Sequence, residues 1–142
     1  MLGRYNLGQL LSMAGIAEGV ENSNFLLRTD KANFILTLYE KRVDEADLPY
    51  FLGLMNHLSE TGLKCPVPIK DNTGKILQSC AGRVAAIVSF LDGTSQKFPT
   101  VEKCAELGRS LAHFHLKSSS FSLKRKNSLG PDSWLPLLQS VN

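Results

Sequence analysis

A glycine-containing stretch near the N-terminus constrains the fold of this chain more than any other part of the sequence. Apolar runs at residues 10–13 and 25–27 flank a segment that contains Gly15 and Gly19, and a third apolar run at residues 34–39 follows after a short turn. This order predicts a strand, a glycine loop, a second strand, a turn and a third strand. Glycine also permits a positive φ or the close approach of another molecule to the backbone.

The predicted loop, residues 15–24, has the composition of a segment that covers a phosphate. Asn22, Ser23 and Asn24 supply side-chain donors and acceptors beside the two glycines. An ordinary hairpin connection without a ligand explains the same residues equally well, because glycine loops are common. The loop by itself leaves both interpretations open.

Length and composition favour a single globular domain. The chain has 142 residues, and 43% of them are hydrophobic. Its 16 Lys and Arg against 13 Asp and Glu give a net charge of +3, which is too small to indicate a nucleic-acid partner. The basic run at residues 124–126 is expected to be a solvated face. No apolar run approaches the roughly 20 residues of a membrane span, so we expect neither a nucleic acid nor a membrane as a partner.

The three cysteines, Cys65, Cys80 and Cys104, are odd in number and widely spaced. They form no C-x-x-C pair, so the sequence predicts neither a disulfide framework nor a zinc site. Unpaired cysteines fit a reducing compartment, and the N-terminus lacks the charged and apolar regions of a signal peptide. We therefore expect a cytoplasmic location.

Two helices are predicted from the spacing of apolar residues. The first begins after Asp47 as its N-cap and ends at Gly62, and its apolar stripe is expected to face a sheet or another helix. The second begins after Thr100 as its N-cap and runs to about Lys117. His115, in the last turn of the second helix, is expected to be packed and hydrogen-bonded on the apolar face.

Further strand regions lie between the two predicted helices. Residues 67–70 and 75–79 are extended segments on either side of a strong turn signal at residues 71–74. Residues 84–91 form the most continuously apolar run of the chain, which predicts a central strand. The run ends abruptly at residues 92–93, where the chain is expected to leave the sheet.

This order of elements resembles the N-terminal lobe of the protein-kinase-like fold. The segments GIAEGVENSN (15–24), FILTLYEKR (34–42) and DLPYFLGLM (47–55) are more specific, and they resemble homoserine kinases of the aminoglycoside phosphotransferase and choline kinase-like family. The resemblance covers nearly the whole chain. It implies the fold class α+β: a kinase-like N-terminal lobe with about five antiparallel strands and one long helix, followed by a linker helix.

The resemblance implies a kinase that transfers the γ-phosphate of ATP to the side-chain hydroxyl of L-homoserine, on the route to threonine. Residues 1–92 would form the kinase-like lobe with the nucleotide lid and hinge, and residues 93–142 the linker and the first helical part of an incomplete C-terminal lobe. The implied nucleotide-binding residues are Gly15, Gly19, Val20, Asn22, Ser23 and Lys41 near the phosphates, and Ser89, Phe90 and Leu91 at a hinge whose backbone reads the adenine edge.

The chain departs from the usual kinase pattern at two positions. Such folds commonly pair a basic residue of the third strand with a glutamate of the helix. Here Thr37 stands near the expected basic position and Phe51 near the expected acid. Lys41 is the phosphate candidate just beyond the strand, although a solvated lysine explains it equally well. Glu18 and Glu21 oppose phosphate binding unless they point outward or reach Mg²⁺ through water.

The catalytic groups of this fold are expected outside the chain. Phosphoryl transfer needs an aspartate beside the substrate hydroxyl, and an asparagine and an aspartate that hold Mg²⁺, all from the second lobe. No His-x-Asp motif followed by an asparagine at kinase spacing occurs in the sequence. We therefore expect part of a longer enzyme that uses ATP, Mg²⁺ and L-homoserine, inactive as this chain alone. Its exposed lobe interface is expected to favour self-association.

Two alternatives stay open. Another small-molecule kinase of the same family, acting on an amino alcohol, choline or an aminoglycoside, would keep most of its substrate pocket in the second lobe. A non-catalytic binding or regulatory fragment would keep the first lobe and lack the transferase. An aspartate-bearing catalytic loop downstream would favour an enzyme, and a stop codon there would favour the binding module.

Overall fold

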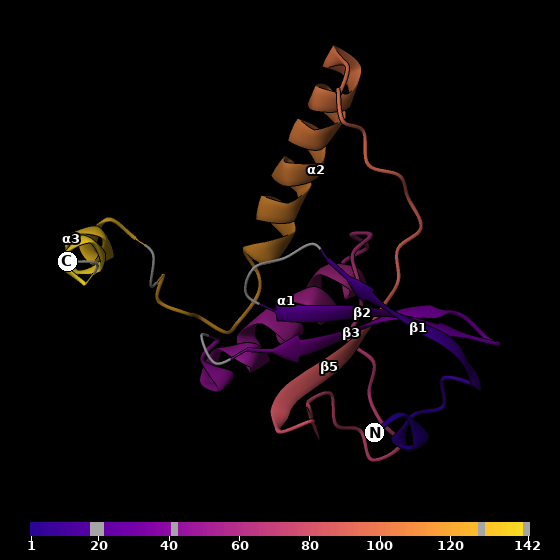
Figure 1. The fold of residues 1–142 in the computed structure, drawn as a ribbon. Coiled ribbons are helices and arrows are strands. Elements are labelled where there is room, and N and C mark those ends of the chain that lie inside the picture. The colour runs from indigo at the N-terminus through magenta and orange to yellow at the C-terminus, as the bar shows by residue number, and fades with distance from the viewer. Residues whose placement is uncertain (18–21, 41–42, 128–129, 141–142) are drawn as a thin grey trace.

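A five-stranded antiparallel sheet is the centre of the molecule. The computed structural model describes residues 1–17, 22–40, 43–127 and 130–140. The strands are β1 (Leu10–Ile16), β2 (Asn22–Thr29), β3 (Asn33–Tyr39), β4 (Gln78–Cys80) and β5 (Arg83–Ser89), in the spatial order β1-β2-β3-β5-β4 (Figure 1). Every neighbouring pair is antiparallel, so the predicted sheet is confirmed.

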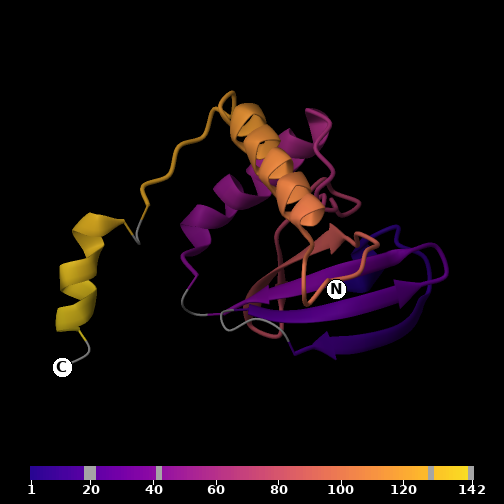
Figure 2. The same ribbon diagram turned by 90° about the horizontal axis from the view of Figure 1, so that it is seen from above.

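Within the described residues, three α-helices and two short 3₁₀ turns accompany the sheet. The helices are α1 (Leu48–Glu60), α2 (Val101–Ser118) and α3 (Pro131–Gln139), and the 3₁₀ turns are η1 (Leu2–Arg4) and η2 (Glu45–Asp47). The helix α1 lies against the sheet, whereas α2 rises away from it and α3 lies apart from both (Figures 1 and 2). The arrangement of a sheet, one packed helix and a following linker helix confirms the α+β fold class.

The two faces of the sheet are covered by different parts of the chain. Leu27, Leu36 and Ile87 point to one face and pack with Tyr5 and Leu7 of the N-terminal segment. On the opposite face, Ala86 packs with residues of α1, and the core there includes Leu48 and Leu52. Because side chains alternate along a strand, each strand serves both cores. We call the face that carries α1 the helix face.

The hairpin predicted around residues 71–74 is only partly present. The turn exists, with Gly74 at φ +86° and its N–H bonded to the Asp71 carbonyl at 2.9 Å. Residues 67–70 form a single bridge, Pro68 to Val88, rather than a strand, and only β4 represents the predicted 75–79 segment. The physical reason is the Asp71 carboxylate, which accepts the backbone N–H groups of Thr73 and Lys75 and so replaces a strand ladder.

The predicted helix starts are at the right positions, but one cap differs. Thr100 caps α2 through its hydroxyl, which accepts the N–H of Lys103 at 3.4 Å. Asp47 precedes α1 but makes no capping hydrogen bond; its carboxylate lies 2.5 Å from the guanidinium of Arg125. Sequence spacing could not show this pair because the partners are 78 positions apart.

The prediction for His115 is wrong, and the helix α3 was not foreseen. His115 is exposed, as are almost all residues of α2. An amphipathic pattern buries a stripe only where another element covers it, and the described residues place none over this one. The helix α3 begins with Gly130 and Pro131, a combination that also fits a turn.

Candidate functional site

The helix face is open over the strands β1 and β2. Residues directly opposite each other in antiparallel strands share a face. Ala14 pairs with Leu26, and Leu26 pairs with Ile35, so the three lie in one row on the helix face. Ile16 pairs with Asn24 in the next row, and its side chain is 37% exposed. This open row is an apolar surface against which a flat group can lie.

The polar end of this surface is formed by Asn24 and Thr37. They are paired across β2 and β3, and the Thr37 hydroxyl donates to the Asn24 Oδ1 at 2.8 Å. Thr37 in turn pairs with Ala86, which contacts α1, so both polar side chains lie on the helix face. The sequence analysis placed Thr37 where related kinases carry a cation; here a hydrogen-bonded neutral pair occupies that place.

The interface between α1 and the sheet is apolar. Leu48, Leu52 and Met55 are the α1 residues in this core. Phe51, near the expected acidic position, is 42% exposed and its ring lies 5.1 Å from the Arg125 guanidinium carbon. None of the ion pairs formed by the described residues joins α1 to β3.

The predicted glycine loop is shorter in the structure. The strands β1 and β2 extend to Ile16 and from Asn22, so Gly15 and Ser23 belong to strands. Gly15 has no positive φ, and a side chain added there would meet only Phe25 at 4.0 Å. Gly15 is therefore not required by a turn. Three other candidates, Gly19, Val20 and Lys41, lie outside the described residues, as do Glu18 and Glu21.

The two polar candidates at the start of β2 face opposite ways. Ser23 pairs with Leu38, whose side chain is in the N-terminal core, and the Ser23 hydroxyl donates to Glu40 at 2.7 Å. Glu40 also forms an ion pair with Arg83 at 2.9 Å. The hydroxyl is thus occupied on the face opposite α1. Sequence patterns did not reveal this Ser23–Glu40–Arg83 group, because Ser23 lies in β2, Glu40 directly follows β3 and Arg83 lies in β5.

Asn22 faces the other way and retains hydrogen-bonding capacity. It pairs with Tyr39, whose ring packs in the α1 core. The Asn22 Oδ1 is buried and has no hydrogen-bond partner among the described residues. Burial raises the pKa of the neighbouring Tyr39 phenol, so that hydroxyl is a neutral donor. An orphaned buried amide is costly unless a further partner satisfies it.

The predicted hinge offers fewer backbone donors than expected. The Ser89 N–H donates to the Val67 carbonyl at 2.9 Å, and the Ser89 hydroxyl accepts the Val67 N–H. The Phe90 N–H donates to the Asn33 carbonyl at 3.4 Å. The Leu91 N–H has no hydrogen bond among the described residues, and its side chain is 38% exposed. Leu91 is thus the hinge position whose donor stays available.

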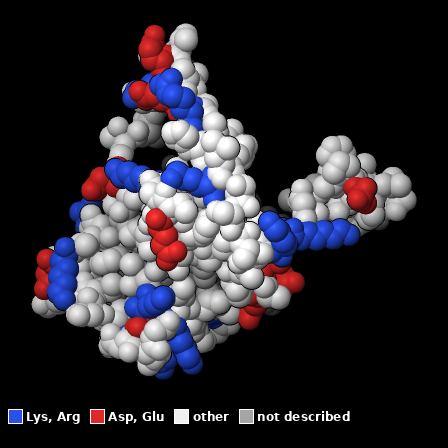
Figure 3. Space-filling model, turned by 180° about the vertical axis from the view of Figure 1, so that it is seen from behind, with Lys and Arg blue, Asp and Glu red and all other residues white. Residues whose placement is uncertain are grey.

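The described residues form neither a patch of one charge on the face seen in Figure 3 nor a cluster of metal ligands. Figure 3 shows Lys and Arg interspersed with Asp and Glu over the visible face, with charges of both signs at the N-terminal end of α2. In the described residues, no group of three or more His, Cys, Asp or Glu side chains is arranged to hold a metal ion. Among the described helices, none combines the length and apolarity needed to cross a bilayer.

The chain is similar in sequence to enzymes named homoserine kinase. It is 55% identical to the homoserine kinase of Parvibaculum lavamentivorans over 139 residues, which cover 98% of this chain and 43% of the relative. It is 54% identical to that of Xanthobacter autotrophicus, over 99% of this chain and 44% of the relative. The chain therefore spans less than half the length of the curated relatives that it matches.

Solved structures show the same fold at low sequence identity. A spectinomycin phosphotransferase in complex with ADP and spectinomycin matches 96% of this chain and 42% of its own, with a TM-score of 0.64 and 18% identity. An aminoglycoside phosphotransferase from Alicyclobacillus acidocaldarius matches 97% of this chain and 38% of its own, with a TM-score of 0.67 and 16% identity. Residues 12–138 match the phosphotransferase enzyme family. The resemblance drawn from the sequence is thereby confirmed, and this chain belongs to the phosphotransferase enzyme family.

Proposed function

We propose that this chain is the nucleotide-binding part of a homoserine kinase, which converts ATP and L-homoserine to ADP and O-phospho-L-homoserine. The observation that carries the proposal is the identity of 54–55% to homoserine kinases over nearly the whole chain. The solved aminoglycoside phosphotransferases are only 16–18% identical, so they support the fold and not the substrate.

The open helix face fits a nucleotide. An adenine ring would lie against Ile16, Leu26 and Ile35, and the Leu91 N–H would donate to its edge. Asn22, with its orphaned amide, would lie toward the phosphates. Gly15, Ser23, Ser89 and Phe90 would contribute through backbone atoms and packing, because the Ser23 hydroxyl and the N–H groups of Ser89 and Phe90 already have partners. Gly19, Val20 and Lys41 complete the proposed phosphate end.

The reaction would proceed by attack of the homoserine hydroxyl oxygen on the γ-phosphorus. The bond from that phosphorus to the β–γ bridging oxygen breaks, ADP leaves, and the hydroxyl proton passes to a base. We assign that base and the Mg²⁺ ligands to a second lobe, which would correspond to the region of the relatives that this chain does not match. Bound Mg²⁺ would neutralise charge on the phosphates.

We place the lobe at residues 1–92 and the linker with the first helical part of the second lobe at residues 93–142. The end of β5 at Ser89 and the start of α2 at Val101 support a boundary between them. We also propose a cytoplasmic location, supported by the three free cysteines.

The decisive experiment assays the full-length protein that contains this chain. With ATP and Mg²⁺, we expect phosphorylation of L-homoserine in preference to choline and spectinomycin, and no turnover by the purified 142-residue chain alone. Preferential phosphorylation of choline or an aminoglycoside would replace homoserine as the substrate. The absence of kinase activity with all three would favour a non-catalytic binding protein.

A variant pair tests the nucleotide surface. Leu26→Trp fills the open row of the helix face, and we expect it to raise KM for ATP about tenfold or more while the circular dichroism spectrum is retained. Lys31→Trp, at an exposed position in the turn between β2 and β3, is the control and should leave KM for ATP unchanged. An unchanged KM in Leu26→Trp would place the nucleotide elsewhere.

A further inference from the structure

The Ser23–Glu40–Arg83 group lies at the end of the sheet where β2 begins and β3 ends. The Ser23 hydroxyl and the Arg83 guanidinium both donate to the Oε1 of Glu40, at 2.7 Å and 2.9 Å. Ser23 is the second residue of β2, Glu40 directly follows β3 and Arg83 is the first residue of β5. One carboxylate oxygen thus connects three strands that are neighbours in the sheet.

The start of β2 is paired on one side only. The last residue pair between β1 and β2 in the described part of the chain is Ile16 with Asn24, whereas the pairs between β2 and β3 continue to Asn22 with Tyr39. Asn22 and Ser23 therefore lie beyond the β1 ladder. A segment with fewer backbone hydrogen bonds opens more easily than a central one, so a side-chain bond there has more influence on its orientation.

The bond of Ser23 controls the direction of Asn22. Successive side chains of a strand point to opposite faces, so a Ser23 hydroxyl held on the face opposite α1 keeps Asn22 on the helix face. The Asn22 Oδ1 is the buried amide oxygen without a hydrogen-bond partner among the described residues. The Glu40 carboxylate thus fixes the strand segment that carries the unsatisfied group.

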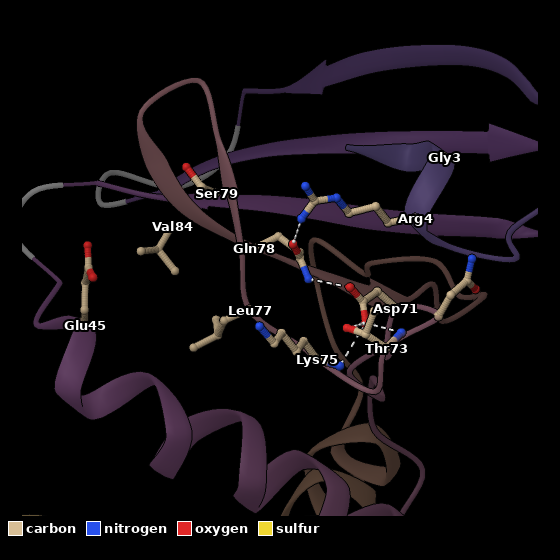
Figure 4. Close-up of a pocket in the computed structure, with 11 residues that line it drawn as sticks. Gly3, Arg4, Glu45, Asp71, Thr73, Lys75, Leu77, Gln78, Ser79 and Val84 are labelled. Atoms are coloured by element: carbon tan, nitrogen blue, oxygen red, sulfur yellow. Dashed lines mark hydrogen bonds between the residues drawn. The ribbon is translucent and has the colours of Figure 1, made fainter.

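A second polar network of the sheet provides a comparison. At the far edge, the Arg4 Nη1 donates to the Gln78 Oε1 at 2.9 Å, and the Gln78 Nε2 donates to the Asp71 Oδ2 at 2.7 Å, beside a pocket of about 690 Å³ (Figure 4). Gln78 belongs to β4, which is separated from β1 by the other three strands. This network ties the N-terminal segment to the far edge of the sheet and lies apart from the start of β2.

We propose that Glu40 and Arg83 are positioning residues for nucleotide binding. Arg83 holds the Glu40 carboxylate, which accepts the Ser23 hydroxyl and so keeps the Asn22 amide directed toward the phosphates. The group lies on the face opposite α1 and acts through Asn22 rather than by contact with the nucleotide. This inference rests on the proposed nucleotide-binding function and adds to it residues that the nucleotide does not touch.

The sign of the effect separates positioning from simple electrostatics. A carboxylate near the phosphates repels them. If Glu40 acted through its charge alone, its removal would therefore lower KM for ATP. A positioning role predicts the opposite, because the start of β2 loses the bond that orients Asn22.

Steady-state kinetics of the full-length protein that contains this chain test the role, with ATP and L-homoserine as substrates. We expect Glu40→Ala to raise KM for ATP about tenfold, and Ser23→Ala and Arg83→Ala to raise it about threefold, since each of these removes one of the two bonds to Glu40. Values of kcat and of KM for L-homoserine should stay within about twofold of the parent. Ser23→Ala should add no further increase in the Glu40→Ala background, because its bond is already absent.

Two control variants separate this role from general stability. Thr29→Ala removes a hydroxyl at the other end of β2, where it donates to the Ala32 carbonyl at 2.9 Å, and should leave KM for ATP unchanged. Arg4→Gln breaks the network at the far edge of the sheet. We expect it to lower the urea midpoint of unfolding and to leave KM for ATP unchanged.

The outcomes distinguish this inference from the function on which it rests. A parent protein that phosphorylates L-homoserine, with KM for ATP unchanged or lowered in Glu40→Ala, would overturn the positioning role alone. An equal rise of KM for ATP in Arg4→Gln would also overturn it, because any loss of stability would then have the same effect. A parent that binds no ATP in titration calorimetry would overturn the proposed function and this inference together. If Glu40→Ala fails to fold, as judged by circular dichroism, an unchanged KM for ATP in Ser23→Ala overturns the role.

Discussion

At the scale of single residues, Thr37 places a neutral hydrogen-bonded side chain on the helix face of the sheet. Its hydroxyl donates to Asn24 at 2.8 Å in a partly buried pair, and the nearby α1 side chains are apolar. A lone buried lysine would cost more than this neutral pair, because the α1 residues in this core, Leu48, Leu52 and Met55, offer no acid to match it.

Removing this hydroxyl should destabilise the chain. We expect Thr37→Val to lower the free energy of unfolding by about 1 kcal/mol, because the Asn24 acceptor loses its partner. Urea unfolding followed by circular dichroism measures the change. Ser110→Ala, at an exposed position of α2, is the control and should have no effect. Equal midpoints for Thr37→Val and the parent would contradict the prediction.

Leucines at buried and exposed positions should differ sharply. Leu27 is fully buried between the sheet and the N-terminal segment, whereas Leu107 is 70% exposed on α2. We expect Leu27→Ala to cost about 2–5 kcal/mol and Leu107→Ala less than about 0.5 kcal/mol in the same unfolding experiment. Similar costs for the two variants would show that α2 is covered in solution.

Asp71 should make stability depend on pH. Burial raises the pKa of its carboxyl, but the hydrogen bonds from Thr73 and Lys75 outweigh burial and hold the pKa below its ordinary value of 3.8. A group with a depressed folded pKa stabilises the fold above its unfolded pKa, and this contribution is lost as the pH falls from about 4 through the folded value.

The test is the free energy of unfolding as a function of pH. We expect the parent to lose stability below about pH 4, and Asp71→Asn to show a shallower loss over that range. Asp92→Asn, at an exposed carboxyl without hydrogen-bond partners among the described residues, should keep the steeper slope of the parent. Identical slopes for Asp71→Asn and the parent would remove Asp71 as the source.

At the scale of elements, α1 is held by the last turn of α2 and by the segment that follows it. The His57 Nε2 contacts the Lys117 carbonyl at 2.9 Å, and the Lys117 ammonium donates to the Thr61 carbonyl. Farther along the helix, the Phe121 ring lies against Tyr50 with centroids 5.6 Å apart. The position of α1 on the sheet is thus coupled to the linker as well as to the core.

Gly53 of α1 packs closely against Phe121 and Leu123. A Cβ at Gly53 would lie 3.2 Å from the Phe121 Cζ. In the Phe121→Ala background we expect Gly53→Ala to stabilise the chain by about 1 kcal/mol, the usual gain in a helix interior. In the parent the gain should be smaller by at least about 0.5 kcal/mol, because the phenylalanine must move. A double-mutant cycle measures the coupling. Additive effects would show that the Phe121 ring moves aside without a measurable energetic cost.

At the scale of the whole molecule, a large apolar surface is exposed. The exposed side chains of α2 include Val101, Leu107 and Leu111, and α3 exposes Trp134 and Leu138. Contiguous apolar surface on a folded chain commonly marks a region that another surface covers. The matched relatives are more than twice as long as this chain.

The isolated chain should therefore associate with itself. We expect sedimentation velocity to show oligomers that grow with concentration, together with binding of a hydrophobic dye. Leu107→Lys with Leu111→Lys should shift the chain toward the monomer, whereas Ser110→Lys on the same helix should not. A monodisperse monomer of the parent that binds no dye would contradict the prediction.

Local patterns were sufficient to predict most elements and insufficient for most side-chain environments. Alternating and helical periodicities predicted the strands, α1, α2 and the turn at residues 71–74, because these signals lie within a few residues of one another. The end of the strand near Ser89 was predicted, but the occupation of the Ser89 N–H by Val67 was not, since that pairing joins distant segments. The wrong prediction for His115 has the same origin: periodicity identifies a stripe and does not identify its cover.

The sequence by itself determined the order of the elements and the phosphotransferase family, because both depend on short-range patterns and specific motifs. Only the tertiary structure decided which side chains share a face. It turned Asn22 and Asn24 to the helix face and Ser23 away from it, and it brought Arg4 to Gln78 across 74 positions. The physical reason is that strand register and long-range packing, which depend on the whole chain at once, fix the direction and partners of each side chain.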